Sequence, residues 1–323
     1  SPIPPPELYM SSFFVIYQLY NLLKSCYKLK KAFLRKNKAL VVKLVDTKDL
    51  KSLPIWECQF ESGRGHQRWK MRIHFTIDKT RKAKITKKVL LKKYKNYSPQ
   101  KSQVIVVIGG DGFMLESLKK YQKYNKPFYG MNRGSFGFLM NKYKTKKIIK
   151  KILKSKSITI SALQMNVITK NNIKKKAISI NEVSLLRQSR QTALLKIMNK
   201  NKIMIRKLIC DGVLVSSPAG STAYNLSVHG PILSLNSKRL AVTPISPFRP
   251  RRWKGKVVTS SSVIKIQNLD TKKRPISVVA DNIEVRNIKS VRIKSNPLIK
   301  FRLLYDKNNN LGQKIKLESF KKR

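Results

Sequence analysis

The sequence predicts an α/β nucleotide-binding domain followed by a mostly β domain, in a chain of 323 residues that is long enough to bury a core in each. The stretch from Val104 to Ile108 is continuously apolar and rich in β-branched residues, like a strand buried on both faces of a parallel sheet. A glycine turn and a helical pattern follow it. From Ser157 onward, short strand-like runs with polar interruptions recur, which predicts the β domain.

The first domain is expected to be Rossmann-like and to cover residues 71–156. Arg72–Ile77 alternates polar and apolar residues like a strand, and Lys84–Tyr94 has one apolar side like a helix. After the Val104–Ile108 strand and its helix, we expect a strand over Pro127–Asn132. An amphipathic basic helix over Lys144–Lys154 then closes the domain.

The second domain is expected to cover residues 157–298. Its predicted strands are Ile158–Ile160, Gln164–Thr169, Lys176–Ile180, Val183–Leu186, Leu194–Met198, Met204–Leu208, Val213–Val215, Val257–Thr259, Val263–Ile266, Ile276–Ala280 and Val291–Ile293. Residues 299–323 form a tail, in which Ile299–Leu304 is expected to be a final strand that returns to the first domain.

The Val104–Ile108 strand ends in Gly109-Gly110-Asp111-Gly112. A glycine turn between a strand and a helix places backbone N–H groups at a helix N-terminus, where phosphate groups bind at close range. Asp111 lies at the carboxyl end of the strand, where open α/β sheets bind ligands. The alternative interpretation is a tight turn in which Asp111 caps the helix.

The segment Asp211–Pro231, here called the hydroxyl-rich loop, combines glycines, prolines and small hydroxyl residues between two apolar runs. Its hydroxyl groups can exchange hydrogen bonds with a ligand. These groups belong to Ser216, Ser217, Ser221, Thr222 and Ser227. The pattern predicts a ligand-binding loop held between two strands, and an ordinary surface loop is the alternative.

The formal net charge of +56 favours polyanions as partners. Yet the excess is mostly Lys spread along the whole chain together with abundant Asn and Ile, as an AT-rich genome would encode. No basic cluster is interleaved with aromatic residues in the manner of a base-stacking platform. We therefore expect no specific nucleic-acid partner.

The three cysteines are widely separated and form no disulfide framework, which suits a reducing cytoplasm. The histidines and cysteines have no metal-ligand spacing, so no protein-bound structural metal is expected. The apolar stretch Met10–Leu23 is shorter than the roughly 20 residues that span a bilayer. It also lacks the features of a signal peptide, and no membrane association is expected.

Residues 1–70 differ from the rest of the chain. Four prolines break structure at the start, and the hydrophobic periodicity of Leu40–Gln67 is poor. The sequence VVKLVDTKDLKSL, followed by ECQFESGRGHQ, resembles the product of a bacterial transfer-RNA gene translated by mistake. We hypothesise that Met71 is the true initiator and that residues 1–70 are a non-homologous extension, either absent from the native protein or disordered.

Three separated motifs have the order and spacing found in NAD kinases. They are VIGGDG over Val107–Gly112, the pair Asn181-Glu182, and the hydroxyl-rich loop with its DGxxxSxPxGSTAYxxS pattern. Gly130–Leu139 also resembles the family's G-x-N-x-G-x-x-G-F-L stretch, Thr243–Pro247 resembles its T-P-I-C-P segment, and FRPRRWKG is similar to the alphaproteobacterial version. The resemblance covers essentially all of residues 71–323 and none of 1–70. GGDG is shared with diacylglycerol, sphingosine and 6-phosphofructokinases, whereas the other two motifs are specific.

The resemblance implies ATP-dependent phosphorylation of the adenosine-ribose 2′-hydroxyl of NAD, with Mg²⁺ on the triphosphate. Asp111 would be the base or the hydroxyl-orienting carboxylate, and the backbone of Gly109, Gly110 and Gly112 would line the phosphates. Asn181 would contact adenine or ribose, and Glu182 a ribose hydroxyl or the metal. The resemblance assigns the adenosine part to Thr222, Ala223, Tyr224 and Ser227, the nicotinamide end to Phe138, and contact with NAD bound to a neighbouring subunit to Asp211. It thus implies a homo-oligomer, a dimer or a tetramer, and leaves polyphosphate open as a second donor.

Alternatives remain at several positions. Glu182 could be a strand-end ion-pair residue, Tyr224 a core aromatic, and Asp211 a residue that fixes a turn. His229 stands where the family usually has glycine, and a positive φ there would strain it. Asp281-Asn282 replaces the common Asp-Gly and tolerates a left-handed conformation nearly as well. A lipid kinase and a basic nucleic-acid-binding protein are the alternative functions.

Overall fold

The computed structural model describes residues 71–135, 137–307 and 314. The proposals made for residues 1–70, including the segment Met10–Leu23, lie outside the described residues. The helices are α2 (Arg81–Leu91), α3 (Asp111–Tyr121), η2 (Gln122–Tyr124), α4 (Ile148–Leu153), η3 (Gly220–Thr222) and α5 (Tyr224–Ser227). The strands are β1 (Ile73–Ile77), β2 (Val104–Gly109), β3 (Phe128–Asn132), β4 (Lys156–Thr169), β5 (Lys174–Ser179), β6 (Glu182–Arg187), β7 (Ala193–Asn199), β8 (Lys202–Cys210), β9 (Gly212–Ser216), β10 (Arg239–Ile245), β11 (Lys256–Thr259), β12 (Val263–Asn268), β13 (Ile276–Ala280), β14 (Ile283–Val285) and β15 (Ile288–Tyr305).

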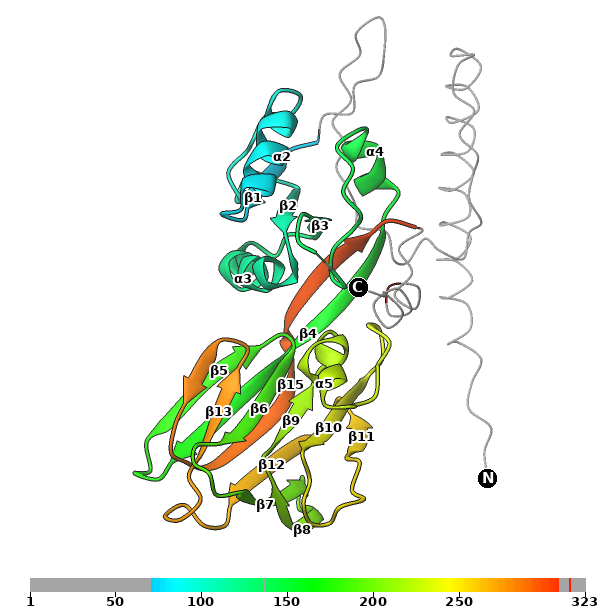
Figure 1. The fold of residues 1–323 in the computed structure, drawn as a ribbon. Coiled ribbons are helices and arrows are strands. Elements are labelled where there is room, and N and C mark those ends of the chain that lie inside the picture. Colours follow the sequence, from blue (N-terminus) through cyan, green and yellow to red (C-terminus); the bar gives the residue numbers. More distant parts are fainter. Residues whose placement is uncertain (1–70, 136, 308–313, 315–323) are drawn as a thin grey trace, which may run out of the picture. The chain divides into compact units, whose positions relative to one another are not determined.

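Strands β1, β2 and β3 pair in parallel, with helices on both faces (Figure 1). Successive side chains of a strand point to opposite faces, and β2 is buried along its whole length. Ile105 and Val107 pack with α3, whereas Val104, Val106 and Ile108 belong to the cluster that contains residues of α2 and α4. The continuous apolar run therefore forms the predicted doubly covered strand.

The second part is mostly β, as predicted. A nine-stranded sheet has the path β1-β2-β3-β15-β12-β7-β8, and off this path β4 pairs with β15 and β5 pairs with β4. A six-stranded antiparallel sheet has the order β11-β10-β9-β6-β13-β14. Buried aliphatic residues of β6, β9, β10 and β13 share one core cluster with residues of β4, β7, β12 and β15. The fold class predicted from the sequence, an α/β part followed by a β-rich part, is confirmed.

Strand β15 connects the two parts of the fold. It pairs in parallel with β3 through Leu303 and Phe128, and antiparallel with β12 and β4. Figure 1 shows β15 and β4 running side by side from the β-rich part to the α/β part. Two strands were expected here, but they form one, whose register against β4 shifts between Asn296 and Lys300. Pro297 lies in that irregularity, as expected for a residue that cannot donate a ladder hydrogen bond.

Other expected elements differ in extent. The helix expected over Lys84–Tyr94 is α2, which begins and ends three residues earlier, over Arg81–Leu91. The basic helix expected over Lys144–Lys154 covers only Ile148–Leu153 and begins after Lys147, whose φ is 55°. The two strands expected over residues 158–169 are the single strand β4. Strand β4 continues through its polar residues because its backbone pairs with β15, whereas the left-handed conformation of Lys147 keeps α4 from extending toward Lys144.

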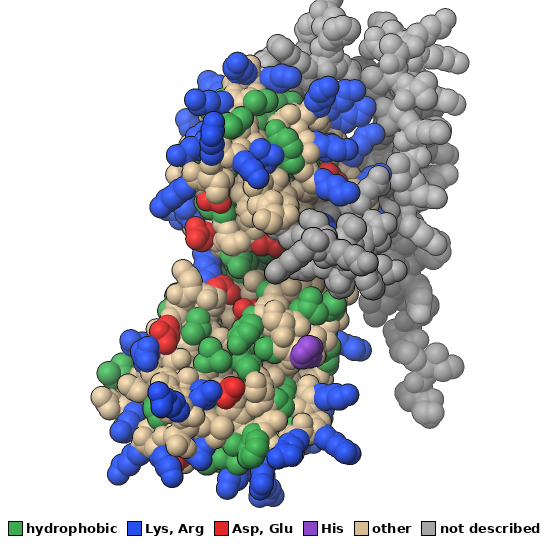
Figure 2. Space-filling model, viewed as in Figure 1, with side chains coloured by type: hydrophobic (Ala, Val, Ile, Leu, Met, Phe, Trp, Pro, Cys, Tyr) green, Lys and Arg blue, Asp and Glu red, His purple; other side chains and the backbone are tan. Residues whose placement is uncertain are grey.

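Basic side chains are distributed over the face seen in Figure 2, on the α/β part and on the β-rich part alike. Acidic side chains are few there and lie mainly between the basic ones. Among the described residues, no helix is both long enough and apolar enough to cross a membrane.

The role of β15 can be tested with Phe301→Ala. Phe301 is 2 % exposed and packs with residues of α3 and β4, so we expect a loss of about 3–5 kcal/mol in the free energy of unfolding. Leu298→Ala is the matched control, because Leu298 in the same strand is 92 % exposed and should change stability by less than about 0.5 kcal/mol. Chemical denaturation measures both, and equal effects would contradict the described packing.

Candidate active site

The glycine turn joins β2 to α3 and leaves open space at the helix N-terminus. A Cβ at Gly109 would lie 2.9 Å from the Phe113 ring, so internal packing explains that glycine. A Cβ at Gly110 would have its nearest neighbour 3.9 Å away, and one at Gly112 would meet nothing within 4 Å. Neither of these two has a positive φ. Since neither conformation nor packing requires glycine there, the open surface suits a ligand group that approaches the backbone.

Asp111 is the first residue of α3, and its carboxylate holds the following loop. Oδ2 accepts the backbone N–H of Phe138 at 2.7 Å, and Oδ1 accepts that of Leu139 at 3.0 Å. The structure thus places Asp111 and Phe138 in direct contact. Sequence reasoning expected Asp111 to face a substrate and did not foresee these two bonds.

Lys314 holds the same loop through its carbonyl groups. Its ammonium group donates to the carbonyl oxygens of Gly137, Phe138 and Met140 at 2.9, 3.1 and 2.6 Å. Burial lowers the pKa of Lys314 to about 8, against the opposing influence of the Asp111 charge. The segment 137–140 therefore has its N–H groups on a carboxylate and its carbonyl groups on an ammonium ion.

Asn181 lies between β5 and β6, and Glu182 is the first residue of β6. Asn181 Oδ1 and Glu182 Oε2 are buried and have no hydrogen-bond partner among the described residues. Burial, with a smaller contribution from the Asp281 charge, raises the pKa of Glu182 to about 7. Buried polar atoms without partners are costly, and a ligand that hydrogen-bonds them removes that cost. The expected pair therefore presents two acceptor atoms suited to a bound hydroxyl or amine group.

Part of the hydroxyl-rich loop serves its own structure. Ser217 Oγ donates to the carbonyl of Ile180 at 2.6 Å and accepts the N–H groups of Ala219 and Gly220. Ser221 Oγ donates to the carbonyl of Pro218 at 2.8 Å. Ser216 Oγ bonds the carbonyl of Ser217. These three hydroxyls therefore form hydrogen bonds with buried backbone groups, a structural role that the sequence analysis did not anticipate.

The other hydroxyl-rich residues are arranged differently. Thr222 ends η3, while Ala223, Tyr224 and Ser227 follow in and before α5. Ser227 is exposed, and Ala223 and Tyr224 are half-buried. Burial raises the pKa of Tyr224, and the charges of Glu182 and Asp211 contribute. Tyr224 therefore lies within the electrostatic reach of both predicted carboxylates.

Asp211 lies between β8 and β9 and is paired. Its Oδ1 atom is 2.6 Å from Arg187 Nε, and its backbone carbonyl accepts the N–H of Arg187 at 2.9 Å. A Cβ at the following Gly212 would lie 2.0 Å from the carbonyl oxygen of Leu185, so β6 and β9 approach closely there. Arg187 was not singled out in the sequence, because its partner is distant along the chain.

A shared apolar cluster brings the three motifs together. Met114 and Leu118 of α3, Ile180 beside Asn181, and Ala219 of the hydroxyl-rich loop are all buried in it. Leu139, whose N–H Asp111 accepts, belongs to the same cluster. At Gly220 a Cβ would lie 2.3 Å from the carbonyl oxygen of Asn181, so the loop backbone rests directly on the Asn181–Glu182 turn.

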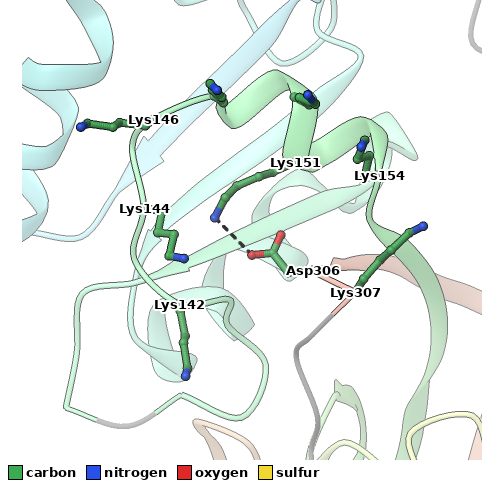
Figure 3. A pocket seen from close by; sticks show the side chains of 9 residues that line it. Lys142, Lys144, Lys146, Lys151, Lys154, Asp306 and Lys307 are labelled. Atoms are coloured by element: carbon green, nitrogen blue, oxygen red, sulfur yellow. Dashed lines mark hydrogen bonds and ion pairs between the residues drawn. The ribbon is translucent and has the colours of Figure 1, made fainter.

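The structure has one cavity beside the loop that Asp111 holds and another outside the predicted site. One of about 380 Å³ is lined by Phe138, Tyr305 and Lys314, among others. Another of about 660 Å³ is lined mainly by lysines, from α4 and its neighbours, and includes none of the predicted site residues (Figure 3). Asp306 is the carboxylate in its described lining, and this group already accepts the Tyr129 hydroxyl at 2.8 Å and lies 3.5 Å from Lys151 Nζ.

Two departures from the family pattern are visible in the backbone. His229 has φ of 61°, so it occupies the left-handed region that was expected to favour glycine there. Asp281 has φ of 52°, and Asn282 does not lie in that region. Asp281 was not predicted as a site residue. Its carboxylate accepts the N–H groups of Ile180 and Asn181, and no signal within the sequence identifies that contact.

A divalent cation was expected with the donor. The described residues contain no group of three or more His, Cys, Asp or Glu that could hold a metal by themselves. Mg²⁺ usually keeps several waters and binds one or two carboxylates together with substrate phosphates. The unpartnered Oε2 of Glu182 fits that donor set, so the residues present are compatible with a metal carried by the phosphates.

Two family models match the chain. Residues 58–158 match the ATP-NAD kinase N-terminal domain, and residues 180–295 match the ATP-NAD kinase C-terminal domain. The first match begins upstream of Met71. Together the matches contain the glycine turn, the Asn181–Glu182 pair and the hydroxyl-rich loop.

Curated NAD kinases are similar to this chain over most of its length. The chain is 42 % identical over 249 residues to the NAD kinase of Brucella suis biovar 1 (strain 1330), covering 77 % of this chain and 97 % of that protein. It is 43 % identical to the NAD kinase of Caulobacter vibrioides (strain ATCC 19089 / CIP 103742 / CB 15), covering 77 % and 96 %.

Two solved structures share the fold. A yeast NADH kinase complexed with NADH has a TM-score of 0.66 at 18 % identity, covering 79 % of this chain and 90 % of that one. An NAD kinase from Archaeoglobus fulgidus in complex with ATP has a TM-score of 0.62 at 21 % identity, covering 76 % and 99 %. On the identity and coverage of the curated relatives, the chain belongs to the NAD kinase family.

Proposed function

We propose that this chain transfers the γ-phosphoryl group of ATP to the 2′-hydroxyl of the adenosine ribose of NAD, giving NADP and ADP. The observation that carries the proposal is one apolar cluster that joins the Asp111 helix, the Asn181–Glu182 turn and the hydroxyl-rich loop. In a member of this family, that cluster assembles the phosphate-binding turn and the motifs specific for the acceptor.

Phosphoryl transfer depends mainly on positioning and on neutralising charge. The 2′-hydroxyl oxygen forms a bond to the γ-phosphorus while the bond to the β–γ bridging oxygen breaks and ADP leaves. In our proposal Asp111 accepts the hydroxyl proton or orients the hydroxyl. The backbone at Gly109, Gly110 and Gly112 lines the donor phosphates. Mg²⁺ on those phosphates would supply positive charge, with Glu182 as the protein carboxylate able to hold it.

The acceptor is recognised, in our proposal, by the groups that the fold leaves without partners. Asn181 Oδ1 accepts from the adenine or a ribose hydroxyl, and Glu182 accepts from a ribose hydroxyl. Thr222, Ala223, Tyr224 and Ser227 contact the adenosine part, and Phe138 lies toward the nicotinamide end. This division is supported by Ser216, Ser217 and Ser221, whose buried hydroxyls already donate to backbone carbonyl groups.

Neither alternative function is favoured. A lipid kinase shares GGDG but is expected to lack the Asn181-Glu182 pair and the GSTAY run, and a nucleic-acid-binding protein needs neither. Incubation with ATP, Mg²⁺ and either NAD or diacylglycerol distinguishes the kinases. Tight binding to a nucleic-acid duplex with a steep salt dependence, and no affinity for NAD, would favour the nucleic-acid-binding function.

We further propose that the protein is a homo-oligomer, a dimer or a tetramer, in which Asp211 contacts NAD bound to a neighbouring subunit. The Arg187 partner of Asp211 would then orient its carboxylate. We propose the cytoplasm as the location and polyphosphate as a second phosphoryl donor. The domain limits 71–156, 157–298 and 299–323 are also proposals. If residues 1–70 are an extension, a chain of residues 71–323 should fold and retain activity.

Asp111→Asn should lower kcat for NADP formation by about 10²–10⁴-fold, the range for loss of a proton-accepting group. The Asn side chain keeps one oxygen for the loop but places an amide donor against the second loop N–H, so the loop also loosens. NAD should still bind within about tenfold of the wild-type affinity, as measured by calorimetry. Near-normal turnover would refute the assignment.

Gly112→Val tests the phosphate turn. The space around Gly112 is open and its φ is not positive, so the free energy of unfolding should change by less than about 1 kcal/mol. The added side chain would occupy the region proposed for the donor phosphates, and KM for ATP should rise at least about tenfold. Lys120→Ala, on the exposed side of the same helix, is the control. An unchanged KM for ATP would place the phosphates elsewhere.

Glu182→Gln tests the raised pKa. Wild-type Glu182 loses its proton near pH 7 and becomes the stronger acceptor, so KM for NAD should fall as pH rises through that value. Gln cannot titrate, and its KM should be flat from pH 6 to 8 and about tenfold higher at pH 8. A carboxyl pKa raised by folding makes wild-type stability, relative to the Gln variant, decrease as pH rises from 4.5 to 7. Parallel pH profiles would contradict the assignment.

A further inference from the structure

Asp281 follows β13 in a left-handed conformation, and its side chain is only 7 % exposed. Oδ2 accepts the backbone N–H of Ile180 at 2.8 Å and lies 2.8 Å from Lys119 Nζ. Oδ1 accepts the N–H of Asn181 at 3.1 Å and lies 2.5 Å from Ser179 Oγ. One carboxylate thus accepts two backbone N–H groups and pairs with Lys119 of α3, while the single proton of the Ser179 hydroxyl is shared between this carboxylate and the carbonyl oxygen of Glu182.

The contacts with residues 179–181 determine the direction of the chain at the acceptor motif. A carboxylate that accepts two consecutive backbone N–H groups fixes the orientation of both peptide planes. Ser179 Oγ also lies 2.6 Å from the carbonyl oxygen of Glu182, and the Asp281 N–H approaches that oxygen at 3.4 Å. The peptide groups on both sides of the Asn181 and Glu182 side chains are therefore tied to Asp281.

The contact with Lys119 reaches the other half of the site. Lys119 lies on α3, the helix that begins at Asp111. Eight residues of α-helix span about 12 Å and behave as one rigid rod. Lys119 also lies 3.4 Å from Asn282 Oδ1. Through Asp281, the ammonium group of Lys119 therefore connects helix α3, which begins at Asp111, to the Asn181–Glu182 turn.

We propose that Asp281 and Lys119 are a positioning pair that sets the Asn181–Glu182 turn against the helix that carries Asp111. The pair touches neither substrate; it acts through the residues that do. This inference rests on the proposed function for its kinetic consequences, but its structural core, the fixed turn, can be tested without any activity.

A plain stabilising ion pair is the competing explanation. Buried ion pairs often contribute little net stability, because the loss of solvation offsets the attraction. If stability were the only role, variants would lose active protein while the remaining molecules kept a normal KM. A positioning role predicts a change in KM for one substrate and not for the other.

The first experiment compares Asp281→Asn and Lys119→Met with Glu284→Gln and Lys120→Met. Glu284 and Lys120 are exposed and lie on the neighbouring strand and the same helix. Asp281→Asn should raise KM for NAD about 10- to 100-fold, and Lys119→Met about 3- to 10-fold, with KM for ATP within about twofold. The double variant should cost less than the product of the two single effects. Unchanged KM values in both would overturn the proposal.

The second experiment is hydrogen exchange of the Ile180 and Asn181 amides in the full chain. Asp281→Asn should speed exchange of these two amides at least about tenfold, while the Glu284→Gln control leaves them unchanged. Unaltered exchange would overturn the inference, whatever the activity. If the wild-type chain made no NADP but Asp281→Asn still sped the exchange of these two amides, the proposed function would be refuted and the positioning pair would stand.

Discussion

The apolar contact of helix α3 with residues of the β-rich part is the constraint on which the site depends. Met114 and Leu118 share one buried cluster with Ile180 and Ala219. Each of these residues is adjacent to, or on the same element as, a polar group of the site. The position of Asp111 relative to Asn181 therefore depends on non-polar packing, which is dense and tolerates little displacement, and the Lys119–Asp281 ion pair acts on top of it.

The polar groups of the site divide into two classes by what they bond. Asp111, Ser217 and Asp281 are occupied by backbone groups, and each holds a loop or a turn in place. Asn181 Oδ1 and Glu182 Oε2 are buried without such partners among the described residues. A site built in this way keeps its geometry without a ligand and retains acceptors for one. The lysine-rich surface contributes general positive potential and is not needed for that geometry.

Long strand β15 makes the arrangement a single unit. It pairs with β3 of the parallel sheet and with β4 and β12 of the β-rich part, so the sheet is continuous through both parts. The same strand end supplies Leu304, whose carbonyl accepts the Asn141 amide at 2.9 Å beside the loop that Asp111 holds. The glycine turn and its loop thus rest on a strand that arrives from the C-terminal part of the sequence.

Sequence alone determined the fold class, the buried strand over Val104–Ile108, the glycine turn and the motifs that identify the family, because these are local patterns of apolar residues, glycines and hydroxyls. It could not determine that β15 is one strand, that Ser217 is occupied by Ile180, or that Asp281 holds the turn before Glu182. Those features depend on contacts between residues far apart in the chain. Backbone hydrogen bonds and close packing choose such partners only when the whole fold is formed, so tertiary structure decided them.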